Sequence, residues 1–308
     1  MPSAYLQTGD LPAYNVPNAT ASQIQQASLQ IDTYLGRSEG LVWSPDSDGN
    51  PCYMSGLQPE LTLSLNSPIN PGQNVVVGVS GPTGMLQVGS VLIADRANQS
   101  LVEALVVASV SGQNVTFESV ANSHAANATL DSGLTIVEQR TMPENRPITA
   151  VSKTPVMRMI SGVGRYGYMR RSEDSVGSID TYNLLAVMSK FGGPPAWEAW
   201  TPQANSIDPK TGMVWVPAGV LLAYYTEVRM HYVAGWAQAN LPAPIKQACA
   251  NIINNIMGTN GLPGTAQKFQ AGDTSFQRFG TQPGVLNSLV IDDDTKQLLQ
   301  PYVAQVMA

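Results

Sequence analysis

The chain has 308 residues, of which only 12% are charged, and its formal net charge at pH 7 is −6. This acidic balance argues against a protein that holds nucleic acid mainly by neutralising phosphates. No stretch approaches about 18 consecutive apolar residues. The N-terminus lacks a basic, apolar signal region, so we expect a soluble chain made in the cytoplasm, with no membrane segment. The many amide side chains suit burial in an assembly, because desolvating an amide costs less than desolvating an ion.

The first predicted element is an amphipathic helix that begins near Thr20. Thr20 and Gln23 have the spacing of a capping box, and Gly36 is placed to end the helix in a left-handed conformation. Between them, apolar side chains recur at helical spacing: Ile24, Ala27, Ile31, Tyr34 and Leu35.

Residues 42–146 are predicted to form a separate all-β domain. Short β-branched runs, separated by Gly, Pro, Asn and Ser, replace the helical periodicity. This pattern favours a small antiparallel sandwich or barrel. The six expected strands cover residues 61–65, 75–79, 88–93, 104–110, 114–120 and 134–139.

Residues 147–226 are predicted to contain short strands at 148–151, 155–160 and 213–216, with a tight turn at 207–212. Gly162-x-Gly164-x-x-Gly167 matches the spelling of a dinucleotide-binding motif, but no apolar helix follows it. We therefore expect a glycine-kinked β turn and no cofactor. A Pro-rich loop carries two tryptophans, which either anchor an interface or cover the core: Trp197 and Trp200.

The clearest helix signal follows a predicted strand at residues 228–233. Asn240 can cap the helix, Pro242 suits its first turn and Gly258 suits its C-cap. One apolar stripe lies between them: Ile245, Ala248, Cys249, Ile252, Ile253, Ile256 and Met257. Residues 259–287 lack periodicity and are predicted to form an irregular arm.

A short C-terminal helix is predicted after Ile291. An aspartate at its N-cap suits the helix dipole, and Leu298 with Leu299 provides its apolar face. Three adjacent carboxylates, Asp292 to Asp294, cannot all face one ion, so the run predicts a capped helix start and no metal site.

Residues that could carry catalysis are few. Neither histidine, His124 or His231, has a neighbouring pattern that suggests a catalytic triad, so we expect structural roles for both and no enzyme. Asp46-x-Asp48-x-Asn50 begins like a calcium loop, but Gly49 stands at the fourth position instead of the sixth. The sequence here favours a surface turn.

Three stretches together resemble the head–tail connector (adaptor) proteins of tailed bacteriophages. The first is the opening from Leu6 to Tyr14, followed by Ile31-Asp32-x-Tyr34-Leu35-Gly36-Arg37. The second runs from Tyr232-x-Ala234-Gly235-Trp236 to Ile245-Lys246-x-Ala248, and the third is Leu298-Leu299-x-Pro301-Tyr302. In addition, the run that begins at Val88, with acidic Glu103 and a His-Ala turn, is similar to a β-module common in phage structural proteins.

The resemblance implies an α+β fold, in which residues 1–41 and 147–308 form a small helical connector core with a β-hairpin or sheet element. Residues 42–146 would be an inserted all-β, sandwich or barrel-like domain. The implied function is structural: a ring, a dodecamer in this family, beneath the portal protein at the neck of the virion, assembled in the bacterial cytoplasm. Such a ring extends the channel for double-stranded DNA, which passes without specific binding, and docks the next neck or tail-completion protein.

In this family the C-terminal segment engages the portal, so residues 288–308 are the first candidates for that contact. The candidate interface residues are Leu298, Leu299, Pro301, Tyr302, Val303, Trp197 and Trp200. One alternative is a tail-associated carbohydrate- or receptor-binding protein that uses the β domain. Clustered aromatic side chains would favour it, but Phe117 is the only Phe, Tyr or Trp in residues 54–146. A hydrolase is a second alternative, which the presence of only two histidines disfavours.

Overall fold

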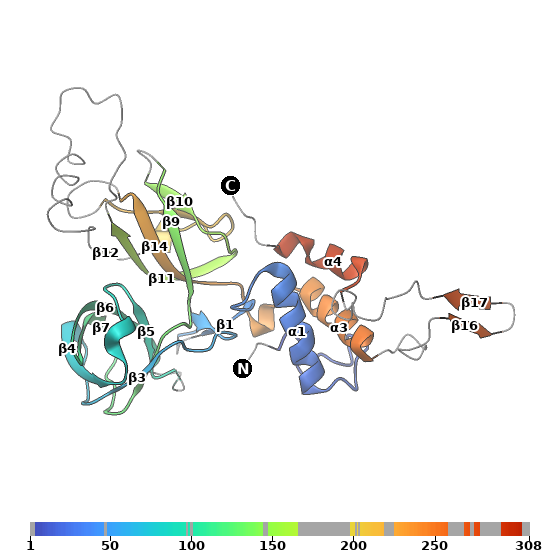
Figure 1. Ribbon diagram of the computed structural model, residues 1–308, viewed down its shortest axis with the longest axis horizontal. Coiled ribbons are helices and arrows are strands. Elements are labelled where there is room, and N and C mark those ends of the chain that lie inside the picture. Colours follow the sequence, from blue (N-terminus) through green and yellow to red (C-terminus); the bar gives the residue numbers. More distant parts are fainter. Residues whose placement is uncertain are drawn as a thin grey trace, which may run out of the picture. The chain divides into compact units, whose positions relative to one another are not determined.

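The computed structural model describes residues 4–45, 48–96, 98, 101–143, 147–165, 198–200, 202, 204–218, 225–257, 268–271, 274–277 and 291–303. The fold is mixed α+β, mostly β with few helices, and includes a closed six-stranded barrel (Figure 1). The chain forms two compact units, here termed the β unit (Leu41–Ala237) and the helical unit (Pro2–Gly40 with Gln238–Ala304).

Helix α1 (Ala21–Leu35) confirms the first predicted helix and both of its ends. The Thr20 hydroxyl accepts the Gln23 N–H at 3.3 Å, and the Gln23 side chain accepts the Thr20 N–H at 2.9 Å. This is the predicted capping box. Gly36 ends the helix with a left-handed φ of 65°. The buried face of α1 carries two polar residues among its apolar ones: Ile24, Ala27, Ser28, Ile31, Asp32 and Leu35.

Helix α3 (Ala243–Met257) confirms the long second helix, although it starts later than predicted. Asn240 belongs to the short 3-10 turn η3 (Gln238–Asn240), and Pro242 precedes the helix. The proline within the first turn is Pro244, whose missing N–H costs nothing there because first-turn donors have no intrahelical partner. The predicted apolar stripe is buried over its first three turns: Ile245, Ala248, Cys249, Ile252 and Ile253.

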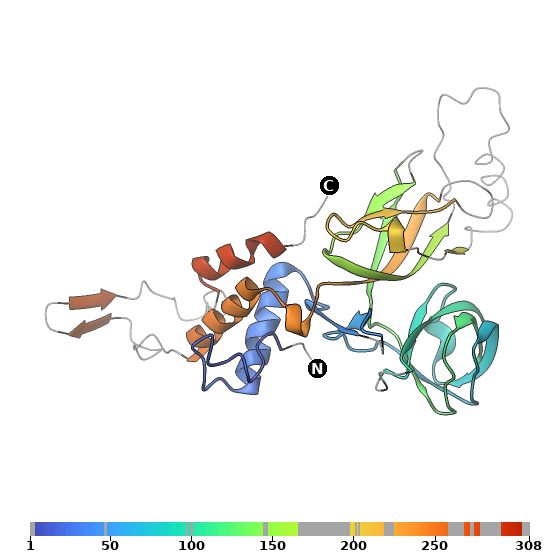
Figure 2. The same ribbon diagram turned by 180° about the vertical axis from the view of Figure 1, so that it is seen from behind.

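Helix α4 (Asp293–Leu299) begins as predicted with an aspartate cap. The Asp292 carboxylate accepts the Thr295 N–H at 2.8 Å, and the 3-10 turn η4 (Gln300–Tyr302) follows the helix. Helix α3 contacts both α1 and α4, and the three helices lie side by side in both views (Figure 1 and Figure 2). Each Leu or Ile side chain fully buried between them contributes roughly 1.5–3 kcal/mol to folding.

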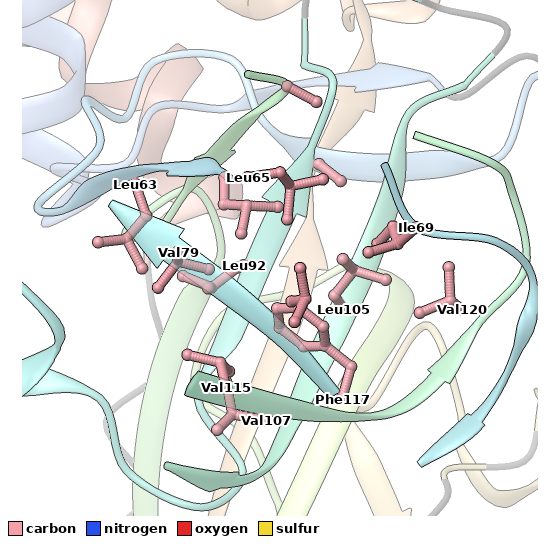
Figure 3. Close-up of a cluster of buried hydrophobic side chains, with 14 of the residues drawn as sticks. Leu63, Leu65, Ile69, Val79, Leu92, Leu105, Val107, Val115, Phe117 and Val120 are labelled. Carbon is pink, nitrogen blue, oxygen red and sulfur yellow. The ribbon is translucent and has the colours of Figure 1, made fainter. Parts of the chain in front are cut away.

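The predicted sandwich or barrel is a closed barrel in which each strand has two antiparallel neighbours, in the order β3-β4-β7-β6-β5-β8. Its interior is filled by aliphatic side chains around the fully buried ring of Phe117 (Figure 3). The strands are β3 (Thr62–Leu65), β4 (Gly72–Ser80), β5 (Val91–Ala94), β6 (Glu103–Ser111), β7 (Asn114–Val120) and β8 (Thr129–Asp131).

The strand expected at residues 134–139 exists, but its assignment to the barrel was wrong. It is β9 (Ile136–Thr141), which pairs with β14 (Glu227–Ala234) in the four-stranded sheet β12-β11-β14-β9. The sixth barrel strand is instead β8, which bonds to both β3 and β5 and so closes the barrel. A closed barrel has no free edge, so the next strand has to pair elsewhere.

The glycine-kinked turn expected at Gly162 and Gly164 was also wrong, because both residues lie inside β11 (Val156–Arg165). A Cβ added at Gly162 would lie 2.2 Å from the Trp200 ring of β12 (Glu198–Trp200), and one at Gly164 would lie 2.3 Å from the Tyr225 ring. These glycines therefore let two aromatic rings pack directly on the strand backbone.

The two ends of the β unit lie side by side. Strand β1 (Val42–Pro45) pairs in parallel with β15 (Trp236–Ala237) and antiparallel with β2 (Pro51–Met54). Gly235, at a φ of 113°, passes so close to Leu41 that an added Cβ would lie 2.1 Å from its carbonyl oxygen. The Ala-Gly-Trp turn after β14 thus needs glycine for space as well as for conformation.

The remaining strands form two separate two-stranded antiparallel sheets. Strand β10 (Ile148–Ala150) pairs with β13 (Met213–Trp215), and both were predicted. Strands β16 (Lys268–Ala271) and β17 (Thr274–Gln277) form an antiparallel pair inside the segment expected to be an irregular arm. That prediction was wrong for these eight positions, because a strand of four residues is too short to show periodicity.

The contacts divide the chain differently from the expected boundaries at residues 41 and 147. Residues 147–237 group with the barrel in one compact unit, and only residues 238–304 join the N-terminal segment. The reason is the pairing of β14 with β9, which ties the segment after residue 147 to the segment before it.

Candidate functional site

The C-terminal helix and its following turn contain most of the predicted interface residues. Leu299 is fully buried and contributes to the packing of the helical unit, whereas Val303 is 40% exposed and Pro301 is exposed. Leu298 and Tyr302 are half-buried. The apolar side chains that a partner can reach without rearrangement therefore lie at the end of this segment.

Two amide side chains of α3 help to hold α4 in place. Asn251 donates to the Thr295 hydroxyl at 3.4 Å, and Asn255 donates to the Asp292 carboxylate at 3.5 Å. Although burial opposes it, the bonds from Thr295 and Asn255 lower the pKa of Asp292, so the cap remains charged at neutral pH. A charged cap at a helix N-terminus stabilises the helix, which keeps the exposed turn after α4 on a fixed support.

Of the two predicted tryptophan anchors, Trp200 is 7% exposed and packs on the backbone of Gly162. It belongs to the core of the four-stranded sheet, together with Met230 and Tyr225. The Tyr232 hydroxyl, on the same strand as Met230, donates to Glu138 of β9 at 2.7 Å. These residues serve internal packing.

Several predicted features lie outside the described residues. They are Trp197, Gly167, Gly258, Asp46 and the greater part of the arm at 259–287.

A buried polar cluster lies where the N-terminal segment crosses α1. The Tyr5 hydroxyl donates to the Asp32 carboxylate, and the Tyr5 N–H donates to the Ser28 hydroxyl at 3.1 Å. Arg37 and Glu39 form an ion pair at 2.8 Å, with side chains only 1% and 4% exposed. Burial raises the pKa of Asp32 to about 7; the Tyr5 bond and Arg37 oppose this shift and Glu39 adds to it.

A second buried cluster lies at one end of the barrel. The His124 ring is inaccessible to solvent; its Nδ1 lies 2.6 Å from Asp95 and its Nε2 lies 2.5 Å from Glu103. Glu103 also accepts the backbone N–H groups of Ala121 at 2.8 Å and Asn122 at 3.0 Å. The sequence singled out His124 and Glu103, but gave no signal for Asp95.

The other histidine has the opposite environment. His231 lies on β14, where burial and then the nearby Arg229 lower its pKa to about 4. It is therefore uncharged at neutral pH. Cys249 is buried in α3, and burial raises the pKa of its thiol to about 12, so it is not a thiolate nucleophile.

Among the described residues, no three His, Cys, Asp or Glu side chains are arranged to hold a metal ion. Within the same part of the chain, no helix has the length and apolar character needed to cross a membrane. No protein-family model matches this chain, and no curated protein is significantly similar to it.

Proposed function

We propose that this protein is a structural head–tail adaptor of a tailed bacteriophage. In this proposal, copies of the chain form a ring, of twelve subunits as in the family it resembles, beneath the portal protein at the neck of the virion. The ring extends the DNA channel and docks the next neck or tail-completion protein. The proposal rests on the resemblance of the two ends of the chain, which the fold brings together.

The contact that carries the proposal joins Asp10 to Lys246. Each belongs to a stretch on which the resemblance is based, and the Lys246 ammonium lies 3.1 Å from the Asp10 carboxylate. A second link joins the same segments, because the Gln238 side chain donates to the carbonyl of Ala4 at 3.0 Å. Residues more than 230 positions apart thus belong to one helical unit, as a small helical connector core requires.

The chain connections of the β unit agree with an insertion into that core. Its two ends meet at Leu41, which accepts the Trp236 N–H at 2.9 Å. A domain can be inserted at low cost where its ends lie close together. In the proposal, the inserted part is the whole segment 41–237, and the barrel is one portion of it.

The portal contact is assigned to the end of the C-terminal segment. Leu299 and the Asp292 cap fix α4, and the exposed Pro301 and Val303 follow it. A fixed helix that presents apolar side chains suits an interface, because little conformational freedom is lost when the partner binds. A net charge of −6 suits a channel wall past which DNA slides without being held.

The alternative of a carbohydrate- or receptor-binding tail protein has less support. Sugar-binding surfaces commonly use exposed aromatic rings, whose apolar faces stack well. Phe117, the one aromatic residue of residues 54–146, is fully buried in the barrel. The barrel therefore offers no aromatic platform.

The proposal is tested by affinity capture of the tagged chain from phage-producing cells, with mass spectrometry of the proteins recovered. Val303→Asp places a charge at the proposed contact, and Val76→Asp makes the same change on a barrel strand at a position that is 65% exposed. Both sites are exposed, so each variant should keep its stability within about 0.5 kcal/mol.

We expect the portal protein to be recovered with the unaltered chain and with Val76→Asp, and to be lost with Val303→Asp. Deleting residues 288–308 is a less specific test, since it also removes the buried Thr295 and Leu299. Recovery of fibre or baseplate proteins without the portal, from the unaltered chain, would refute the adaptor role.

A further inference from the structure

The contacts of His124 require one proton more than a neutral ring supplies. Both ring nitrogens lie within hydrogen-bond distance of a carboxylate oxygen, at 2.6 Å from Asp95 and 2.5 Å from Glu103. A neutral imidazole has only one N–H, whereas imidazolium has two. Without the extra proton, one contact would place a nitrogen lone pair against a carboxylate oxygen.

His124 joins four segments of the barrel through its ring and its backbone. Asp95 follows β5, Glu103 begins β6, and His124 itself lies in the connection between β7 and β8. The His124 backbone also exchanges two hydrogen bonds with Ile69, each of 3.0 Å, in the connection between β3 and β4. Because the ring is inaccessible to solvent, water cannot replace a contact that is lost.

Asp95 and Glu103 are the charged groups that face the ring among the described residues. The segments at Ile69 and at residues 121–123 contribute uncharged side chains, and Arg96 lies 3.4 Å from a different carboxylate, Asp131. Burial acts to lower the pKa of His124, but the hydrogen bonds and charges of Glu103 and Asp95 outweigh it and raise that pKa above 6.5.

We propose that Asp95, His124 and Glu103 form a proton-dependent clamp that closes one end of the barrel and opens when the shared proton is lost at higher pH. The clamp ties down the backbone at Ile69, Ala121 and Asn122, so these contacts loosen when it opens. This inference does not depend on the proposed role of the protein in the virion.

The sign of the pH effect follows from the direction of the shift. A histidine whose pKa is higher in the folded state stabilises the fold fully below the pKa of the free side chain, about 6.5. This stabilisation is lost as the pH rises from that value through the raised pKa of the clamped ring. Above the raised pKa, stability no longer changes on account of this group.

The experiment combines NMR titration of the full chain, carrying isotope-labelled histidine, with hydrogen exchange across the same pH range. The chain has only two histidines, so the signals are assigned with His231→Asn. We expect His124 to titrate above pH 6.5. Protection at Ile69, Ala121 and Asn122, corrected for intrinsic exchange, should fall by up to about tenfold per pH unit until that titration is complete.

Asp95→Asn is the matched variant. Asn tolerates the left-handed φ of 50° at this position and keeps a hydrogen-bond acceptor while removing one charge. It should lower the pKa of His124 and shift the loss of protection to lower pH. Glu103→Gln is the second variant. Glu60→Gln, at an exposed carboxylate of the same unit, is the control and should leave unchanged both the pKa of His124 and the pH at which protection is lost.

Two results would overturn the clamp. The first is a His124 that titrates at or below pH 6.5. The second is protection at Ile69, Ala121 and Asn122 that stays constant while His124 titrates, because the ring would then be a passive part of the core.

Discussion

The two units of this chain stabilise a buried ionisable group in opposite ways. In the helical unit, the Asp32 carboxyl has one neutral donor, the Tyr5 hydroxyl, and burial raises its pKa to about 7. In the barrel, both nitrogens of His124 face carboxylates, which favour the charged ring despite its burial. The helical unit therefore favours a neutral side chain, whereas the barrel favours a charged one.

Both units lose stability as the pH rises, but over different ranges. The contribution of Asp32 is fully present below its unfolded pKa of 3.8 and is lost as the pH rises through about 7. The contribution of His124 is lost only above its unfolded pKa of 6.5. Between these two unfolded values, Asp32 should weaken the helical unit, whereas His124 leaves the stability of the barrel unchanged.

The variant with the largest expected effect tests whether the two units unfold independently. Phe117→Ala removes the only aromatic ring of the barrel core and should destabilise the β unit by about 3–5 kcal/mol. The helical unit should keep its own transition, seen by calorimetry and by the helical circular dichroism signal. A single transition that moves as a whole would show that the units unfold together, and the comparison would fail.

Asp32→Asn tests the comparison in the helical unit. Because Asn cannot ionise, the variant should be more stable than the unaltered chain by up to about 4 kcal/mol at pH 8, and similar to it at pH 3. Denaturant unfolding followed by helical circular dichroism from pH 3 to pH 8 measures this difference. Asp294→Asn, at an exposed position, is the control. If the stability of Asp32→Asn and that of the unaltered chain depended on pH in the same way, Asp32 would not be the cause of the pH dependence.

The smallest effect concerns the start of α1. Thr20→Ala removes the capping box and should destabilise the helical unit by about 1 kcal/mol, with no change in the barrel. Thr33→Ala, which removes a hydroxyl bonded to the Leu29 carbonyl within the same helix, should have less effect. Thermal unfolding distinguishes the two variants. A larger loss of stability from Thr33→Ala than from Thr20→Ala would show that the cap does not determine the stability of α1.

Local signals were sufficient for the helices and for most of the barrel. The capping box at Thr20 and the left-handed Gly36 each depend on residues within a few positions, and both were predicted correctly. The pairing of β9 with β14 was not predictable, because it joins residues about 90 positions apart whose strand pattern is compatible with several partners. Strand β8, with only three residues, is too short to show alternation.

The candidate sites were likewise only partly predictable from the sequence. His124 and Glu103 were each visible in the sequence, but Asp95 lies 29 positions before the ring that it contacts. Leu299 and Val303 were equally plausible as interface residues, since a helical apolar stripe does not indicate which of its members another helix will cover. The fold distinguishes them, because Leu299 is buried and Val303 is 40% exposed.

The most direct test of the proposed function is electron cryo-microscopy of the neck of the assembled particle. We predict a ring of this chain beneath the portal, with the segment that follows α4 in contact with it. Density for the chain in a fibre or baseplate, with none beneath the portal, would contradict the account.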